Sequence, residues 1–188
     1  MAYDFEPEAH RKEIESEILQ IAEPFSAVLD LLYTLPGLDK NPMTAIAILS
    51  EIGPDMSVFP SSKHLVSWAG CCPRNDQSNQ KVKSRRISRA GSYLKPLLVQ
   101  VANALIKSKK HPEFKERYHR IKSRRGHKKA VIAVCKMLLT AIWNMLSKLE
   151  PYNPEGFLEH RPVRQEKTLT VSQALELLRL RGYTITNQ

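Results

Sequence analysis

The 188-residue sequence predicts an all-α fold, and three observations lead to that prediction. Apolar residues recur every three or four positions in most segments, which is the spacing of one helix face. Gly, Pro, Ser and Asn stand where those segments begin and end, as helix caps require. Apolar residues make up 42% of the chain, enough to build a real core. We therefore expect a compact multi-helix domain.

The first predicted helix covers residues 8–34 and has an interrupted coiled-coil pattern. Steps of four and three, the spacing of coiled-coil a and d positions, separate its apolar residues: Ile14, Ile18, Ile21, Phe25, Val28 and Leu32. Pro24 falls inside the run, so we expect a kink or two shorter helices. Two interpretations stay open, a coiled-coil-like helix that dimerises and an amphipathic helix that lies on the core.

Residues 35–53 resemble a helix-hairpin-helix element. Gly37 supplies a tight turn, Asn41 caps the next helix with Pro42 at its first position, and Gly53 ends that helix. In such elements backbone N–H groups hold a DNA phosphate without reading sequence, which makes Gly37 and Lys40 candidate nucleic-acid-binding residues. The alternative is a packing corner between two helices.

A short helix over residues 63–69 comes next and is stopped by Gly70. Leu65, Val66 and Trp68 are available for burial. The polar stretch that follows, residues 71–86, carries five Lys or Arg against one Asp and reads as a loop between helices. A basic loop between rigid elements is suited to gripping a polyanion, and Ser78 could present a hydroxyl to it.

The charge of the chain is concentrated around this loop. Residues 61–130 hold 19 of the 29 Lys and Arg but only three of the 19 Asp and Glu, which gives them a net charge of +16. The other residues sum to −6, against +10 for the whole chain. A basic middle with acidic flanks favours a binding face for nucleic acid over a set of merely solvated helix faces.

Three more helices follow the loop. We expect them to run from about residue 91 to 107, from 111 to about 123, and from 126 to 149, the last being the central core helix. The middle one has an almost purely cationic face, suited to phosphate contacts that carry no base code. Pro151, Pro154, Gly156 and Pro162 mark a linker before a last short helix at 171–180. The expected domains are 1–34, 35–150 and 151–188.

The residues exclude several kinds of chemistry. Three cysteines without CxxC spacing argue against a disulfide framework and a zinc site, and favour a reducing compartment. No acidic cluster suits two-metal phosphoryl transfer, and we expect no metal in this chain. Ser78 remains as a candidate nucleophile whose transition-state charge nearby cations could offset, or as an ordinary loop serine.

A series of short motifs then suggests a family. They are Leu35-Pro36-Gly37, Ala45, Glu51-Ile52-Gly53, Phe59-Pro60-Ser61, Trp68-Ala69-Gly70, Pro73, Ser78, Lys81, Ile87-Ser88-Arg89, Gly91, Tyr93-Leu94, Leu97-Leu98 and Lys128-Lys129-Ala130. In this order, over roughly residues 30 to 150, they resemble the C-terminal domain of the insertion-sequence 110/116/902 family of transposases. The family usually has glycine after the serine, whereas this chain has Asn79 and Gln80, and Asn tolerates positive φ.

The resemblance implies a function in DNA transposition. The family's helical domain supplies a serine that attacks DNA and forms a phosphoserine link, and Ser78 occupies its position. A separate N-terminal domain holds the carboxylates and divalent metal, a coiled coil connects the two, and a guide RNA directs target choice. By this resemblance the chain is a truncated transposase of the bacterial or archaeal cytoplasm, associated with the nucleoid.

Two functions are carried forward. The first is the DNA-binding C-terminal domain of a serine-type recombinase that breaks and rejoins phosphodiesters, inactive without the missing domain. The second is a non-catalytic nucleic-acid-binding remnant of a transposase. Expected partners are DNA, a guide RNA, and a second copy or full-length transposase, with no membrane. The candidate binding residues are Gly37, Lys40, Arg74, Lys81, Lys83, Arg85, Arg86, Arg89, Arg124, Arg125, Lys128 and Lys129.

Overall fold

The computed structural model describes residues 7–72, 76–78, 81–84, 91–155 and 171–181. The chain divides into two compact units, Met1–Pro154 and Glu155–Gln188. The first unit contains the helices that position the site. In the second, the structure describes one helix, α9 (Val171–Leu180).

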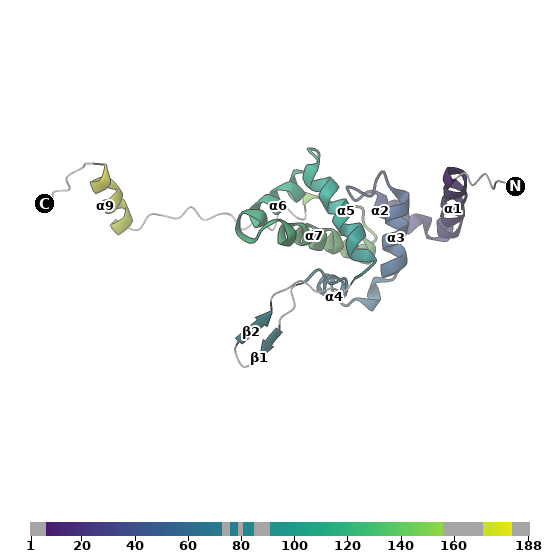
Figure 1. The fold of residues 1–188 in the computed structure, drawn as a ribbon, viewed down its shortest axis with the longest axis horizontal. Coiled ribbons are helices and arrows are strands. Elements are labelled where there is room, and N and C mark those ends of the chain that lie inside the picture. The colour runs from purple at the N-terminus through teal and green to yellow at the C-terminus, as the bar shows by residue number, and fades with distance from the viewer. Residues whose placement is uncertain (1–6, 73–75, 79–80, 85–90, 156–170, 182–188) are drawn as a thin grey trace. The chain divides into compact units, whose positions relative to one another are not determined.

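The first unit is helical, as predicted, with one small sheet (Figure 1). Its helical elements are α1 (Pro7–Ala22), the 3₁₀ turn η1 (Glu23–Phe25), α2 (Ser26–Tyr33), α3 (Pro42–Ile52), the 3₁₀ turn η2 (Met56–Val58), α4 (Ser62–Trp68), α5 (Leu94–Lys107), α6 (Pro112–Arg125) and α7 (His127–Lys148). Two strands, β1 (Asp76–Ser78) and β2 (Lys81–Ser84), lie within the predicted loop. The all-α class is therefore confirmed, with a hairpin where an irregular loop was expected.

Helix α7 is the centre of the core. It contacts α2, α4, α5, α6 and η2, and ten of its residues are buried (Figure 1). Within the described chain it is also the one helix long and apolar enough to cross a membrane, but 56% of its most apolar window is buried inside the protein. Burial on several sides explains its composition, because a helix surrounded by protein is apolar around most of its circumference. Leu149, expected as the last residue of this helix, instead lies just beyond it in a left-handed conformation and is exposed.

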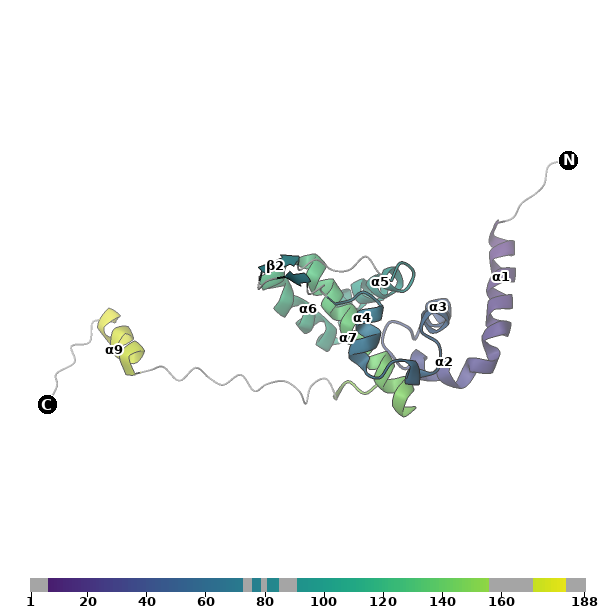
Figure 2. The same cartoon turned by 90° about the horizontal axis from the view of Figure 1, so that it is seen from below.

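The N-terminal helix is broken at Pro24, as its sequence predicts. η1 contains Pro24 and separates α1 from α2. Leu29 and Leu32 of α2 are buried, whereas Ile14 and Ile21 of α1 are exposed. α1 makes its main contacts with η1 (Figure 2). The periodic stripe therefore joins the core only in its second half, and the interpretation that the whole helix lies on the core is wrong.

The turn between α2 and α3 is packed against α5. Leu35 and Leu38 are completely buried. Gly37 has φ = +89°, and a Cβ there would lie 2.8 Å from Cγ1 of Val101. Glycine is therefore needed both for its conformation and for the close approach of α5. Asn41 caps α3 as expected, its side chain accepting a hydrogen bond of 3.2 Å from the Thr44 N–H.

Helix α4 ends in a Schellman motif. The Gly70 N–H donates to the Ser67 carbonyl and the Cys71 N–H donates to the Val66 carbonyl, each over 3.0 Å. Gly70 has the positive φ that this motif requires. The predicted stop at Gly70 is thus confirmed. Trp68, predicted as available for burial, is 48% exposed.

The residues on either side of the hairpin meet in space. Gly91 has φ = +73°, and a Cβ there would overlap the carbonyl oxygen of Ala69 and lie 3.1 Å from its carbonyl carbon. The Gly91 carbonyl accepts a hydrogen bond from the Lys95 N–H, in the first turn of α5. The segment of residues 71–90, hereafter the hairpin segment, therefore leaves and re-enters the helical domain at one place, its base, formed by Ala69 and Gly91.

Tyr152 ties the chain after α7 back to earlier elements. Its backbone N–H donates to Oγ1 of Thr34 over 2.8 Å, and its hydroxyl donates to Oε1 of Glu113 over 3.2 Å. Its ring stacks on Phe114 with centroids 6.3 Å apart. One residue thus joins the end of α2 to the start of α6.

Replacing Tyr152 with Phe should lower stability in a pH-dependent way. The lost hydrogen bond should cost about 1 kcal/mol at neutral pH. Burial, and then the Glu113 carboxylate, raise the pKa of Tyr152. A raised pKa means that the stabilisation is complete below the pKa of free tyrosine, near pH ~10, and is lost as pH rises through the folded-state pKa. The difference in free energy of unfolding between wild type and Tyr152→Phe should therefore narrow as the pH rises above ~10, the pKa of free tyrosine. Tyr93→Phe, at an exposed position, is the control and should change nothing.

Gly91→Ala should destabilise the protein through the base of the hairpin segment. Positive-φ strain and overlap with the Ala69 backbone should together cost about 2–4 kcal/mol, measured by urea denaturation. Gly126→Ala is the matched control, since Gly126 has φ = +81° but nothing within 4 Å of the added Cβ. Equal losses for the two variants would show that the contact with Ala69 contributes nothing.

Candidate nucleic-acid interface

The predicted catalytic serine lies at the end of the first hairpin strand. β1 and β2 pair in antiparallel fashion, with Ser78 opposite Lys81 and Gln77 opposite Val82. Asp76 pairs with Ser84, so the register shifts between Asp76 and Gln77. The hairpin therefore brings the backbone of Ser78 next to that of one predicted phosphate-binding lysine.

The other predicted residues of this segment are placed only in part. Lys83 lies in β2 at the shift in register. The remaining four, Arg74, Arg85, Arg86 and Arg89, lie outside the described residues. Among the residues predicted from the sequence for this segment, the structure thus shows one new relation, the pairing of Ser78 with Lys81.

A second group of predicted residues surrounds the junction of α6 and α7. Gly126 is both the last cap of α6 and the first cap of α7, its N–H donating to the Lys122 carbonyl and its carbonyl accepting from the Ala130 N–H. Two cations precede it and two follow it, all of them exposed: Arg124, Arg125, Lys128 and Lys129. We call this group the basic corner. Within the described residues none of the four forms an ion pair.

The electrostatics of the basic corner favour an anion. The first turn of α7 contains no acidic residue, and no side chain caps its N-terminal N–H groups. These groups carry the positive end of the helix dipole, which adds to the charge of Lys128 and Lys129. Further along α6, burial, and then the charge of Arg120, lower the pKa of Arg117. Arg117 and Arg120 thus repel each other as a smaller effect beside burial, and a polyanion would relieve that repulsion.

The basic corner is held in shape by aromatic contacts. The Tyr118 hydroxyl and Nδ1 of His127 share a hydrogen bond of 2.8 Å that joins the two helices. Lys122 lies 5.4 Å from the centre of the Tyr118 ring. Because Tyr118 is buried, these contacts fix the angle between the C-terminus of α6 and the N-terminus of α7.

The α2–α3 turn leaves fewer backbone N–H groups free to hold a phosphate than a helix-hairpin-helix element would. The Gly37 N–H donates to Oδ1 of Asp39 over 3.2 Å, and the Leu38 N–H donates to the Leu35 carbonyl over 3.1 Å. Two backbone donors of the turn are thus engaged internally, one of them by a carboxylate. Lys40 is exposed beside them. A phosphate contact at Gly37 remains a prediction.

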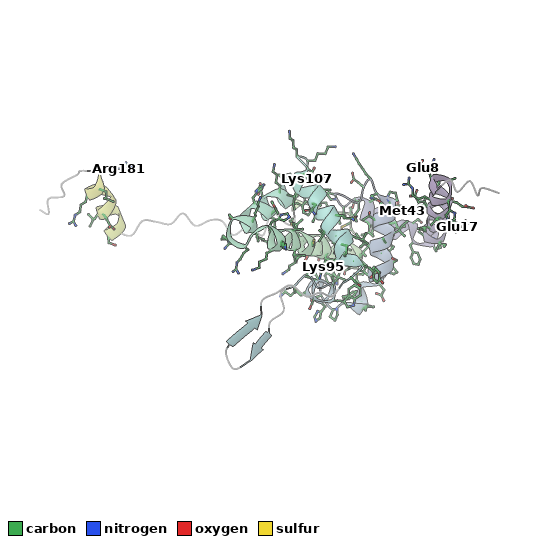
Figure 3. The ribbon with its side chains drawn as sticks, viewed as in Figure 1. Glu8, Glu17, Met43, Lys95, Lys107 and Arg181 are labelled. Carbon is green, nitrogen blue, oxygen red and sulfur yellow. The ribbon has the colours of Figure 1, made fainter. Side chains whose placement is uncertain are left out.

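Sequence reasoning missed the surroundings of the hairpin base. Figure 3 shows Lys95 at the end of α5 beside α4, with Lys107 at the opposite end. Burial raises the pKa of the Cys71 thiol to about 11, an effect that Lys95 partly offsets. Two large aromatic side chains, Trp68 and Tyr93, are exposed next to the base. Helical spacing alone could not have shown this, because it marks which residues share a face and not whether that face is covered.

Comparisons with known proteins find similar transposases. Residues 29–119 match the model of the transposase IS116/IS110/IS902 family. The pilin gene-inverting protein of Moraxella bovis is 30% identical over 125 residues, which are 65% of this chain and 38% of that protein. The transposase for insertion sequence element IS1111A of Coxiella burnetii is 29% identical over 122 residues, 63% of this chain and 33% of that protein. No solved structure matches.

The matched region contains the hairpin part of the site but ends before the basic corner. It runs from α2 to α6 and includes the α2–α3 turn, the base of the hairpin segment and both strands. The alignments span less than two fifths of the length of these two relatives. Residues 29–119 of this chain are thus similar to the IS116/IS110/IS902 family of transposases.

Proposed function

We propose that this chain is the DNA-binding part of a transposase and that it grips the DNA backbone with the basic corner and the hairpin segment. The observation that carries the proposal is the group of four exposed cations around Gly126, none of which forms an ion pair within the described residues. The similarity of residues 29–119 to a transposase family supports DNA as the polyanion. Contacts of this kind position a protein on DNA and do not by themselves select a sequence.

The proposed binding has a physical signature in its salt dependence. Each phosphate neutralised by a lysine or arginine releases condensed counterions, so the affinity falls steeply as salt rises. The net charge of +16 over residues 61–130 allows many such contacts. A protein that binds DNA in this way should show a linear fall of log K with log salt concentration.

Lys128→Gln with Lys129→Gln should flatten that salt slope. If both lysines contact phosphates of a duplex, the slope should fall by about 1.8, from roughly 0.9 per contact. The measurement is a titration of labelled duplex by fluorescence anisotropy at several salt concentrations. Lys136→Gln with Lys148→Gln removes the same charge from exposed positions on the same helix and should leave the slope nearly unchanged. Similar slopes for the two double variants would exclude the basic corner from the interface.

A finer proposal concerns catalysis by Ser78. In this proposal the Ser78 hydroxyl attacks a DNA phosphorus, an Oγ–P bond forms, and the bond from phosphorus to a sugar oxygen breaks. The leaving oxygen takes the electron pair and a proton, and Lys81, opposite Ser78 in the hairpin, offsets the developing charge. A divalent metal that activates the serine would come from a separate domain, as would contacts with a guide RNA. A second copy or a full-length transposase is the proposed partner chain.

The alternative is a non-catalytic remnant that binds nucleic acid through the same cations. It is favoured for the isolated chain by the absence, among the described residues, of any group of three metal-ligating side chains. The two proposals share the basic corner and differ only in the role of Ser78.

A covalent adduct separates the two proposals. Wild-type protein mixed with duplex carrying the ends of its element and a full-length family transposase whose own serine is replaced by alanine should form a protein–DNA adduct that survives denaturing electrophoresis. Ser78→Ala should abolish the adduct while its affinity for DNA stays within about twofold, because the serine adds no phosphate charge contact. An adduct that persists in Ser78→Ala, or no adduct in any mixture, would refute catalysis by Ser78 and leave the binding role.

A further inference from the structure

Two exposed aromatic residues flank the base of the hairpin segment. Trp68 immediately precedes Ala69, and Tyr93 follows Gly91 by two positions. Because Ala69 and Gly91 are in contact, the two aromatic residues belong to the two chain segments that meet there. Trp68 is 48% exposed and Tyr93 is 73% exposed. Each of the two segments therefore carries a large ring that the described protein leaves partly uncovered.

The exposed Trp68 ring is nevertheless held in place. Its centroid lies 5.6 Å from that of Phe59, with the planes tilted by 59°. Phe59 is buried, and its carbonyl accepts a hydrogen bond of 2.9 Å from Nε1 of Trp143 in α7. The support thus runs from the core helix to one side of the Trp68 ring. A ring fixed in this way loses little conformational entropy when a flat ligand stacks on it.

Tyr93 has a fixed backbone for a similar reason. It is the N-terminal cap residue of α5, and the next residue, Leu94, is completely buried. Lys95, one residue further on, lies close enough to influence the Cys71 thiol, so a positive charge is present at the base itself. A lysine is therefore present beside the two chain segments that carry the rings.

We infer that Trp68 and Tyr93 stack on unpaired nucleobases of a nucleic acid whose phosphates are held by the neighbouring cations. The inference rests on the proposed binding function and adds the class of ligand, a single-stranded or unpaired stretch. The hairpin segment carries six Lys or Arg against one Asp, which favours a polyanion over a protein partner. An aromatic ring can stack on a base only where the base is not paired within a duplex.

The test compares single strands with duplex, using the full 188-residue chain. The probes are a labelled 20-nucleotide oligothymidylate, its oligouridylate counterpart, an abasic strand of equal length and a duplex of equal length. Trp68→Leu and Tyr93→Leu should each weaken binding to the base-containing strands by roughly 5- to 100-fold and leave duplex binding within about twofold. The two base-containing probes separate DNA from RNA as the source of the unpaired bases.

The controls separate stacking from other effects. Phe25→Leu removes an exposed ring outside the base and should change no affinity. The wild-type protein should bind the abasic strand no more tightly than Trp68→Leu binds oligothymidylate, because the abasic strand cannot stack on either ring. Oligothymidylate should also quench tryptophan fluorescence in wild type but not in Trp68→Leu, which retains only Trp143. Circular dichroism and thermal melting confirm that each variant is folded.

Several outcomes would overturn the inference. Equal affinity of wild type and both leucine variants for oligothymidylate would overturn it. Binding of the abasic strand as tight as that of oligothymidylate would overturn it as well. Loss of self-association in the variants, with strand affinity intact, would assign the rings to a second copy of the chain instead. Each of these results leaves the proposed DNA binding standing, whereas failure of the wild-type protein to bind any probe would overturn both.

Discussion

Burial of α7 is the constraint on which the rest of the described domain depends. This helix packs against α2, α4, α5, α6 and η2, so each of these elements is positioned by the same surface. The burial of ten of its residues removes much apolar area from water, which is the main favourable contribution to folding. The same helix positions both parts of the site, because its N-terminus forms half of the basic corner and Trp143 supports the ring at the hairpin base.

Two glycines at turns allow the basic hairpin segment to leave the helical core and return to it at one place. Gly70 ends α4 in a Schellman motif, and Gly91 lets the returning chain approach the Ala69 carbonyl. The hairpin segment is therefore an insertion with a narrow base on a rigid domain. Segments that carry function are commonly held by rigid elements in this way, since the scaffold positions them while their own sequence is free to serve binding.

The charge distribution has a physical cost that points to a partner. Four cations around Gly126 form no ion pair within the described residues, and the N-terminus of α7 adds positive potential where two of them lie. Such crowding opposes folding slightly and is relieved when a polyanion binds. The similarity to transposases and the charge are independent observations, and both support the proposal that the ligand is DNA. The exposed rings at the hairpin base then suggest that part of this ligand has unpaired bases.

Much of the fold could be predicted from the sequence, because helix periodicity and helix caps are local. The break at Pro24, the cap at Asn41, the stop at Gly70 and the central helix over 127–148 all follow from residues a few positions apart. The clustering of positive charge in the middle of the chain was likewise visible in the sequence, as were the four cations of the basic corner.

Tertiary structure alone decided which apolar and aromatic faces are covered. Ile14 and Leu32 occupy the same periodic stripe, yet one is exposed and the other buried, because α2 packs against α3 and α7 whereas α1 mainly contacts η1. Trp68 looked like a core residue and is half exposed. The hydrogen bond from Tyr152 to Thr34 joins residues that lie more than a hundred positions apart in the chain. The pairing of Ser78 with Lys81 also came from the folded chain. The physical reason is that coverage and strand pairing depend on partners distant in sequence, which no local pattern encodes.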